Sequence, residues 1–252
     1  MVVAGGTIVA LRPGVARSVD ITFSGFNGQS VLVGFTIVVF CASILGLPFG
    51  LPVVFALLVS ELGKVLAHAM LGHDSARFRL VPWLDGAKIS EKPIRSDGEE
   101  FLISIMGPAL CLGPMVILAA VAANTQASAP QLAQSLWTFT ATMGAANFLF
   151  LLPFPPFDGA RCMRCAVASY WPALSPAMAV FMSTAMFTAS LRTGSVFLMV
   201  GALFGLQSIL RSQGHGRVPL KPEHGLIALA AYVFTLAAHF SAGWWLFAAY
   251  FK

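Results

Sequence analysis

The sequence from Phe101 to Ala123 reads FLISIMGPALCLGPMVILAAVAA, without a single charged residue. A transmembrane helix needs about 20 largely apolar residues to cross the hydrocarbon core of a bilayer, and this stretch is long enough. Further stretches of the same character lie on both sides of it, and the first and sixth are shorter than the others. The seven candidate spans are Val31–Gly46, Pro52–Leu71, Phe101–Ala123, Ser135–Phe154, Leu174–Leu191, Ser195–Leu210 and Gly225–Phe251.

The composition of the whole chain agrees with a membrane protein. Of 252 residues, 58% are hydrophobic and only 10% are charged, and the mean hydropathy is +0.82. Soluble chains carry about 25% charged residues, and a soluble domain of this composition would lack the polar surface to cover its core. We therefore expect an all-α polytopic membrane protein with six or seven transmembrane helices. An N-terminal segment, 1–30, would precede a single transmembrane domain, 31–252.

The distribution of Lys and Arg predicts the orientation of the chain. The stretch 124–134 contains no charge, so we place it outside the cell. If the spans alternate from there, most of the 15 Lys and Arg residues fall in inner segments, as the positive-inside rule requires. The N-terminal segment would then lie in the cytoplasm. With six spans instead of seven, the C-terminus would change sides.

The segment 77–90 departs from the helical pattern. Basic and apolar residues alternate over 77–80, and Pro82 and Asp85-Gly86 follow as turn-forming residues. This pattern is typical of a short β-hairpin, which would lie at the inner membrane surface. The alternative is an irregular polar loop.

Ionisable residues interrupt one apolar stretch at Leu57–His68. On a helix, Ser60 and Lys64 lie one turn apart on one face, with Glu61 beside them. A charge inside a span costs at least about 2.5–3.5 kcal/mol on insertion scales, so such groups usually face a partner or a cavity. The alternative is that these residues lie near a helix end, at the membrane surface.

A second carboxylate, Asp158, follows the proline-rich stretch 152–157. Three prolines in this stretch lack the backbone N–H that a helix needs, so a helix is expected to end just before Asp158. Like the charged residues of the other stretch, Asp158 lies next to apolar sequence. It is therefore a candidate site residue, with an interfacial position as the alternative.

Both places carry motifs that resemble those of site-2 intramembrane metalloproteases. Glu61-Leu62-Gly63 resembles the H-E-L-G-H zinc motif, and Gly107-Pro108 is similar to the G-P segment of the family's third helix. The stretch from Asn147 to Gly159 resembles the signature N-x-x-P-x-x-P-L-D-G. The segment 77–90 also lies where the family has a hairpin near its substrate path. The resemblance covers about residues 50–165 and implies a site-2 protease-like core of membrane helices.

The same resemblance implies a zinc site that this chain has lost. In the family, two histidines four residues apart and a distant aspartate bind zinc, and the glutamate is the general base. Here Ser60 and Lys64 occupy the histidine positions, while Glu61 keeps the position of the base and Asp158 that of the third ligand. A hydroxyl is a poor zinc ligand and an ammonium has no lone pair. We therefore expect no zinc or other cofactor and no catalytic residue, because no metal would activate water.

Lys64 offers a positive charge in place of the ion. We predict that its ammonium lies within about 4 Å of the Asp158 carboxylate, which would otherwise be desolvated without compensation. The alternative is that Lys64 extends to the cytoplasmic surface. His68 is not expected to complete a metal site, because it lies seven residues from Glu61, about 10 Å along a helix axis. We expect instead a hydrogen-bonded His68, or a His68 at the membrane surface near His73.

These observations imply a catalytically inactive, site-2 protease-like membrane protein. It would bind transmembrane segments in the former substrate groove, or serve as a subunit or assembly component of a larger membrane complex. The expected partners are the lipid bilayer and transmembrane helices of other proteins. Nucleic acid is not expected, because the chain has no basic stripe with aromatic residues. The resemblance makes a bacterial inner membrane the expected location.

Two other functions stay open at this point. The first is an active intramembrane zinc metalloprotease with unusual ligands. The second is an ion or proton transporter, in which Glu61, Lys64 and Asp158 would act as a relay.

Overall fold

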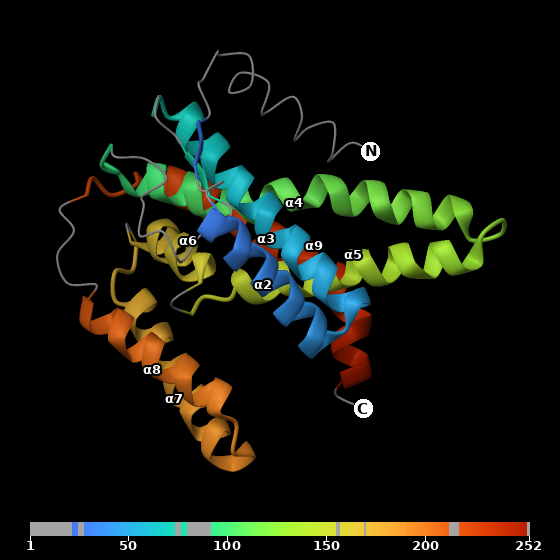
Figure 1. Ribbon diagram of the computed structural model, residues 1–252. Helices are drawn as coiled ribbons and strands as arrows, with labels where there is room; N and C mark the ends of the chain where they lie inside the picture. Colours follow the sequence, from blue (N-terminus) through green and yellow to red (C-terminus); the bar gives the residue numbers. More distant parts are fainter. Residues whose placement is uncertain are drawn as a thin grey trace. The chain divides into compact units, whose positions relative to one another are not determined.

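Helices dominate the part of the chain that the computed structural model describes, which comprises residues 22–24, 28–73, 77–79, 92–154, 157–168, 170–211 and 217–250 (Figure 1). The elements in chain order are β1 (Thr22–Ser24), α2 (Gly28–Leu45), α3 (Leu47–Met70), β2 (Arg77–Arg79), α4 (Asp97–Thr125), α5 (Pro130–Phe150), α6 (Asp158–Val167), α7 (Leu174–Thr193), α8 (Val196–Arg211) and α9 (Pro222–Tyr250).

Each predicted span coincides with one of the helices α2 to α5 and α7 to α9. Four helices are long and apolar enough to cross a membrane: α3, α4, α7 and, over Pro222–Ala248, α9. Shorter apolar stretches lie in α2 and α8, at Gly34–Leu45 and Leu198–Gln207. Hydroxyl and amide residues in the first half of α5 lower its hydropathy. The predicted all-helical membrane protein is therefore confirmed in outline, and the number of six or seven spans stays a prediction.

Glycine residues in left-handed conformations end or separate several helices. Gly46 has φ +78° between α2 and α3, and Pro48 follows in the first turn of α3, where a proline costs the helix no hydrogen bond. Gly194 has φ +68° after α7, and its N–H donates to the Ser190 carbonyl at 2.8 Å. A residue with a Cβ would be strained at both positions.

The strand content differs from the predicted hairpin. Residues Arg77–Arg79 are extended, as the alternating pattern indicates, but their partner is β1, with Thr22 opposite Arg77. This pairing is parallel, whereas a hairpin would pair 77–79 with the residues that follow. The remainder of the predicted hairpin, 80–90, lies outside the described residues, so the hairpin is not confirmed. The N-terminal segment 1–30 also lies largely outside them.

The chain divides into two compact units, each described here by itself. Unit 1 comprises residues 1–93, 106–148 and 237–252, and unit 2 comprises residues 94–105 and 149–236. The helix α4 contributes its first turns to unit 2 and the remainder to unit 1. The predicted single transmembrane domain, 31–252, stays a prediction.

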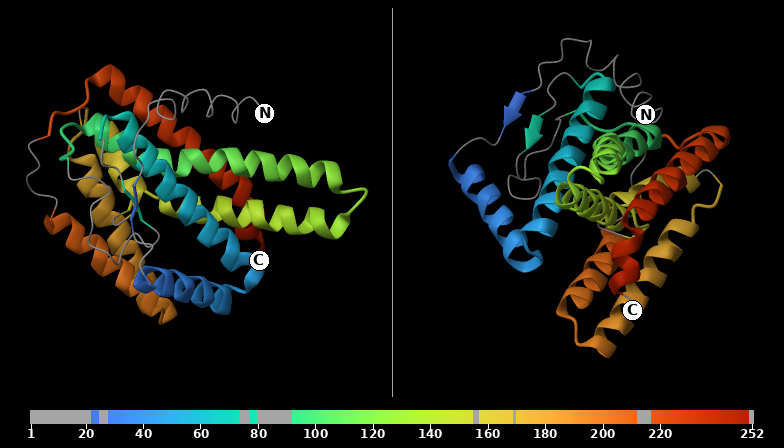
Figure 2. Two further views of the ribbon diagram at one scale, coloured as in Figure 1. Left: turned by 45° about the horizontal axis from the view of Figure 1, so that its top comes forward. Right: turned by 90° about the vertical axis from the view of Figure 1, so that its right-hand side faces the viewer.

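Unit 1 is held together by close contacts between helices. The second part of α4 and α5 run side by side, as Figures 1 and 2 both show. The core consists of small and flexible side chains, and a Cβ added at Gly144 would lie 2.8 Å from the Cβ of Ala242 on α9. Small residues let membrane helices approach until their backbones are nearly in contact. The core residues are Ala56, Cys111, Met115 and Met143, with Val59, Phe139 and Ala242 packed against them.

Unit 2 contains the helical pair α7 and α8 and a core around α6. Gly205 on α8 allows the close approach of Ser183 on α7 and of the Phe154 ring. The Tyr232 hydroxyl donates to the Leu151 carbonyl at 2.6 Å, which satisfies both groups inside the core. That core is formed by Phe101, Ile105, Leu151, Cys162, Cys165, Ala166, Ala228 and Tyr232.

Large apolar side chains are exposed on several helices, as a bilayer environment would favour. Examples are Phe35 on α2, Phe181 on α7 and Leu203 on α8, which are 66%, 70% and 58% exposed. In water, such surfaces would favour aggregation, whereas in a membrane they face lipid tails. Exposed apolar residues and four long apolar helices together indicate a membrane protein.

Candidate functional site

The helix α3 carries three of the predicted site residues in unit 1. Ser60 and Glu61 are buried, with only 7% and 2% of their surface exposed, and Lys64 is half-buried one turn further along the helix. Burial of a carboxylate in a membrane-spanning helix is costly, so Glu61 is a functional-site candidate by physical argument alone.

Two of the motifs that carry the family resemblance meet where α3 packs against α4. A Cβ added at Gly63 would lie 2.5 Å from the Met106 carbonyl oxygen and 2.8 Å from the Gly107 Cα. Conversely, a Cβ at Gly107 would collide with the Ser60 Oγ. The two glycines therefore allow backbone contact between the helices, and the Ser60 hydroxyl lies against the α4 backbone.

The donor set of this helix does not fit the zinc ion that the resemblance implies. The Ser60 hydroxyl is a poor zinc ligand and is enclosed by α4 at Gly107, and the Lys64 ammonium has no lone pair to give. A zinc site of the family type would have to rest on Asp158 alone among its three protein ligands.

The C-terminal end of α3 explains the place of His68. Its Nδ1 donates to the Lys64 carbonyl at 2.8 Å, and the expectation of a hydrogen-bonded His68 is confirmed. Gly72, with φ +74°, ends the helix in a Schellman motif, because the His73 N–H donates to the His68 carbonyl at 3.0 Å. This motif brings residues five apart together, and the two imidazole rings lie 5.1 Å apart.

Asp158 begins α6 in unit 2, after the predicted helix break. Helix α5 ends at Phe150, and the proline-rich stretch separates it from α6. Next to Asp158, a Cβ on Gly159 would collide with the Leu151 carbonyl, so the chain turns tightly here. The Asp158 carboxylate forms an ion pair at 3.6 Å with Arg161, which lies one turn further along α6.

The predicted ion pair between Lys64 and Asp158 joins residues of different units. Lys64 belongs to unit 1 and Asp158 to unit 2. Because the two residues belong to different units, the distance between the ammonium and the carboxylate stays a prediction.

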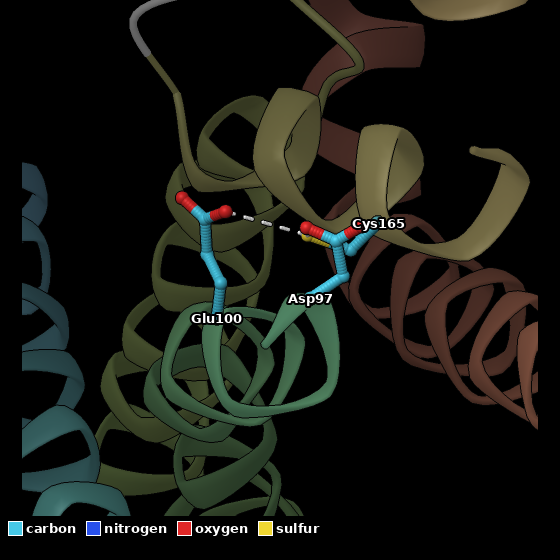
Figure 3. Close-up of side chains that lie close together, drawn as sticks. All are labelled: Asp97, Glu100 and Cys165. Carbon is cyan, nitrogen blue, oxygen red and sulfur yellow. Dashed lines mark hydrogen bonds between the residues drawn. The ribbon is translucent and has the colours of Figure 1, made fainter. Parts of the chain in front are cut away.

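Unit 2 contains a cluster of charged residues that the sequence analysis missed. It consists of Asp97 and Glu100 in the first turn of α4, Arg164 and Cys165 on α6, and Arg217 before α9 (Figure 3 shows the two carboxylates and the thiol). The Glu100 Oε2 accepts hydrogen bonds from both guanidinium groups. The Cys165 Sγ lies 3.5 Å from the same oxygen and 4.0 Å from the Asp97 Oδ1. The side chains are only partly exposed, Glu100 to 10%, Arg217 to 19% and Arg164 to 32%.

Hydrogen bonds that involve backbone groups hold this cluster together at the start of α4. Ser96 caps the helix, because its hydroxyl accepts from the Glu99 N–H at 3.2 Å, and the Glu99 carboxylate accepts from the Arg95 N–H at 2.7 Å. The Asp97 N–H donates to the Val218 carbonyl at 3.0 Å, and the Val218 N–H donates to the Arg95 carbonyl at 3.2 Å. These two bonds fix the position of Arg217 next to Glu100.

The geometry of the cluster would allow a metal ion, but its chemistry favours an ionic cluster. One ligand atom each from Asp97, Glu100 and Cys165 lies within 4.8 Å of the others. Two guanidinium groups already compensate Glu100, and burial, with the Glu100 charge, raises the pKa of the Cys165 thiol. A protonated thiol is a poor ligand, because metals bind the thiolate. The two carboxylates and two guanidinium groups balance to zero net charge.

The start of α4, which carries Asp97 and Glu100 of this cluster, could have been predicted from the sequence. Ser96 followed by Glu99 is a capping box, which predicts the start of α4. The meeting of Glu100 with Arg164 and Arg217 had no such signal, because the three residues lie far apart in the chain and α6 is too short for a span.

No known protein family, no characterised protein and no solved structure matches this chain.

Proposed function

We propose that the chain is a catalytically inactive, site-2 protease-like membrane protein that binds transmembrane segments of other proteins, as a receptor or as a subunit of a membrane complex. The proposal rests on two features of α3, its close packing against α4 and the residues at its zinc-ligand positions. Gly63 and Gly107 keep α3 and α4 in backbone contact, while Ser60 and Lys64 stand where zinc ligands would be needed. A scaffold that keeps its helix packing but lacks metal ligands favours the binding of a partner helix over the hydrolysis of a peptide bond.

The proposal includes a location for the bound segment and an orientation in the membrane. The partner helix would lie along α3, beside the segment 77–90, and Lys64 would compensate the Asp158 carboxylate. Seven spans would place the N-terminus in the cytoplasm of a bacterial cell, with the membrane as the inner membrane. The exposed Leu62 on α3 supplies apolar surface for such a partner.

Metal content and proteolysis test the loss of catalysis. Purified protein is expected to contain no stoichiometric zinc and to cleave no transmembrane peptide. The double variant S60H/K64H is expected to gain zinc if the scaffold keeps the family geometry, and its combination with Asp158→Ala is expected to lose that zinc again. Failure of the double variant to bind zinc would show that the geometry has diverged from that of the family. Zinc in the unmodified protein that disappears on Asp158→Ala, or cleavage of a peptide bond by it, would establish the metalloprotease instead.

Crosslinking in cells tests the binding of a partner. A photo-crosslinking amino acid at Leu62 is expected to capture one discrete membrane protein. The same amino acid at Ile117 on α4, which is 53% exposed, serves as the matched control and is expected to capture lipid. Identical products from both positions would argue against a binding site on α3.

A further inference from the structure

Two fully buried side chains of unit 1 each keep one polar atom without a hydrogen-bond partner among the described residues. They are Asn147 on α5 and His239 on α9, and both are 0% exposed. The atoms are the Asn147 Oδ1 and the His239 Nδ1. Buried polar atoms nearly always have a partner in protein or bound water, so these two require an explanation.

The surroundings of Asn147 fix the orientation of its amide. The Nδ2 donates to the Met143 carbonyl of the same helix at 3.0 Å. Exchanging the oxygen and nitrogen would place two acceptors against each other at Met143. The remaining atom, Oδ1, is therefore an acceptor.

The surroundings of His239 fix its tautomer in the same way. Its Nε2 lies 3.0 Å from the Pro108 carbonyl oxygen on α4, which can only accept, so the proton of the ring is on Nε2. A neutral imidazole carries one N–H. The Nδ1 therefore presents a lone pair and is an acceptor.

His239 reaches α4 at Pro108, and Asn147 lies three residues after Gly144 on α5. The helices α5 and α9 also approach closely here, because a Cβ at Gly144 would lie 3.0 Å from the His239 carbonyl oxygen. Asn147 and His239 thus lie in the packed part of unit 1 where α5 and α9 meet.

We propose that this region binds water, which donates hydrogen bonds to the Asn147 Oδ1 and the His239 Nδ1. Two acceptors require a donor, which excludes an anion or a backbone carbonyl as the ligand. Water is the smallest neutral donor with two hydrogens, and buried water usually fills this role in proteins. The inference is independent of the proposed function, because it rests on neither Ser60 nor Lys64.

A density map of the full chain in lipid nanodiscs, at a resolution that shows ordered water, tests the proposal directly. Water is expected within about 3.2 Å of each of the two acceptors. This water is expected to be lost near residue 147 in Asn147→Leu and to remain in Thr142→Val, a control whose hydroxyl bonds within its own helix. Absence of water at either acceptor, or a metal ion in its place, would overturn the proposal.

The tautomer of His239 gives a second readout that does not depend on the map. In protein labelled with [¹⁵N]histidine, the resonances that disappear in His239→Phe are expected to be those of a neutral ring protonated on Nε2. A ring protonated on Nδ1, or on both nitrogens, would make Nδ1 a donor and would contradict the proposal.

Discussion

Gly107 sets the distance between α3 and α4 in unit 1 because any side chain there would meet the Ser60 Oγ and the Ser60 backbone. The contact is between helix backbones, which cannot move aside as a flexible side chain could. Gly113, six residues further along α4, differs, since a Cβ there would meet no atom within 4 Å beyond its own chain neighbours. Comparing the two glycines of one helix therefore distinguishes the cost of close packing between helices from the local effect of an alanine within the helix.

We predict that Gly107→Ala destabilises the protein by roughly 2 kcal/mol, which is typical of overpacking in a core. Gly113→Ala is the matched control, because Gly113 also precedes a proline and both variants share the restriction that this proline imposes; it is expected to cost less stability than Gly107→Ala. The free energy of unfolding in mixed detergent micelles measures both. Equal stability of the two variants would contradict the close contact at Ser60.

Cys165 is expected to resist thiol reagents in the folded protein. It is fully buried, and burial raises the pKa of its thiol, so the reactive thiolate does not form near neutral pH. We predict that unfolding precedes the modification of Cys165 by N-ethylmaleimide. Peptide mass spectrometry after timed labelling measures the order. Fast labelling of Cys165 in the folded state would show that the core of unit 2 opens readily.

At the scale of elements, Glu100 connects three parts of unit 2. Its carboxylate binds Arg164 of α6 and Arg217 of the segment before α9, and it lies in the first turn of α4. Removing one partner of a buried ion pair costs about 3–5 kcal/mol, because the other charge remains without compensation. Partial exposure of Arg164, at 32%, reduces that cost through solvent screening.

We predict that Glu100→Gln lowers the free energy of unfolding by roughly 2 kcal/mol, below the cost for a fully buried pair. The exposed Glu223, in the first turn of α9, provides the matched control, and Glu223→Gln is expected to change stability by less than about 0.5 kcal/mol. The free energy of unfolding in detergent, measured for both variants, tests this prediction. If only Glu223→Gln lowered the free energy of unfolding, the stabilising role given to Glu100 would be wrong.

The helices were predictable to different degrees, for physical reasons. Apolar length alone predicts α3, α4, α7 and α9, since a helix of about 20 apolar residues satisfies all of its own backbone groups in lipid. The short helix α6 was not predicted, because the prolines before it indicated only a break and its ten residues are too few for a span. The pairing of Arg77–Arg79 with Thr22–Ser24 was not predicted, because the two strands lie far apart in the sequence. Burial of Ser60 and Glu61 agrees with the helical face that the sequence predicts.

At the scale of the whole molecule, the topology in the membrane is open to direct test. We predict that alkaline phosphatase fused at residue 127 is active outside the cytoplasm, and that a fluorescent protein fused at residue 221 folds inside it. A C-terminal phosphatase fusion is expected to be active if seven spans cross the membrane. Activity only in a cytoplasmic reporter at the C-terminus would indicate six spans.

The turn between α4 and α5 offers a practical route to imaging this protein. Residues 126–129 join two helices that run side by side, and the Ala129 N–H and Ser128 hydroxyl bond locally to the Thr125 carbonyl. A rigid helical insert at this turn would continue both helices without disturbing either unit's core. At 26.7 kDa the chain is small for single-particle electron microscopy. An antibody fragment bound to that insert would supply the mass and asymmetry needed to align its images.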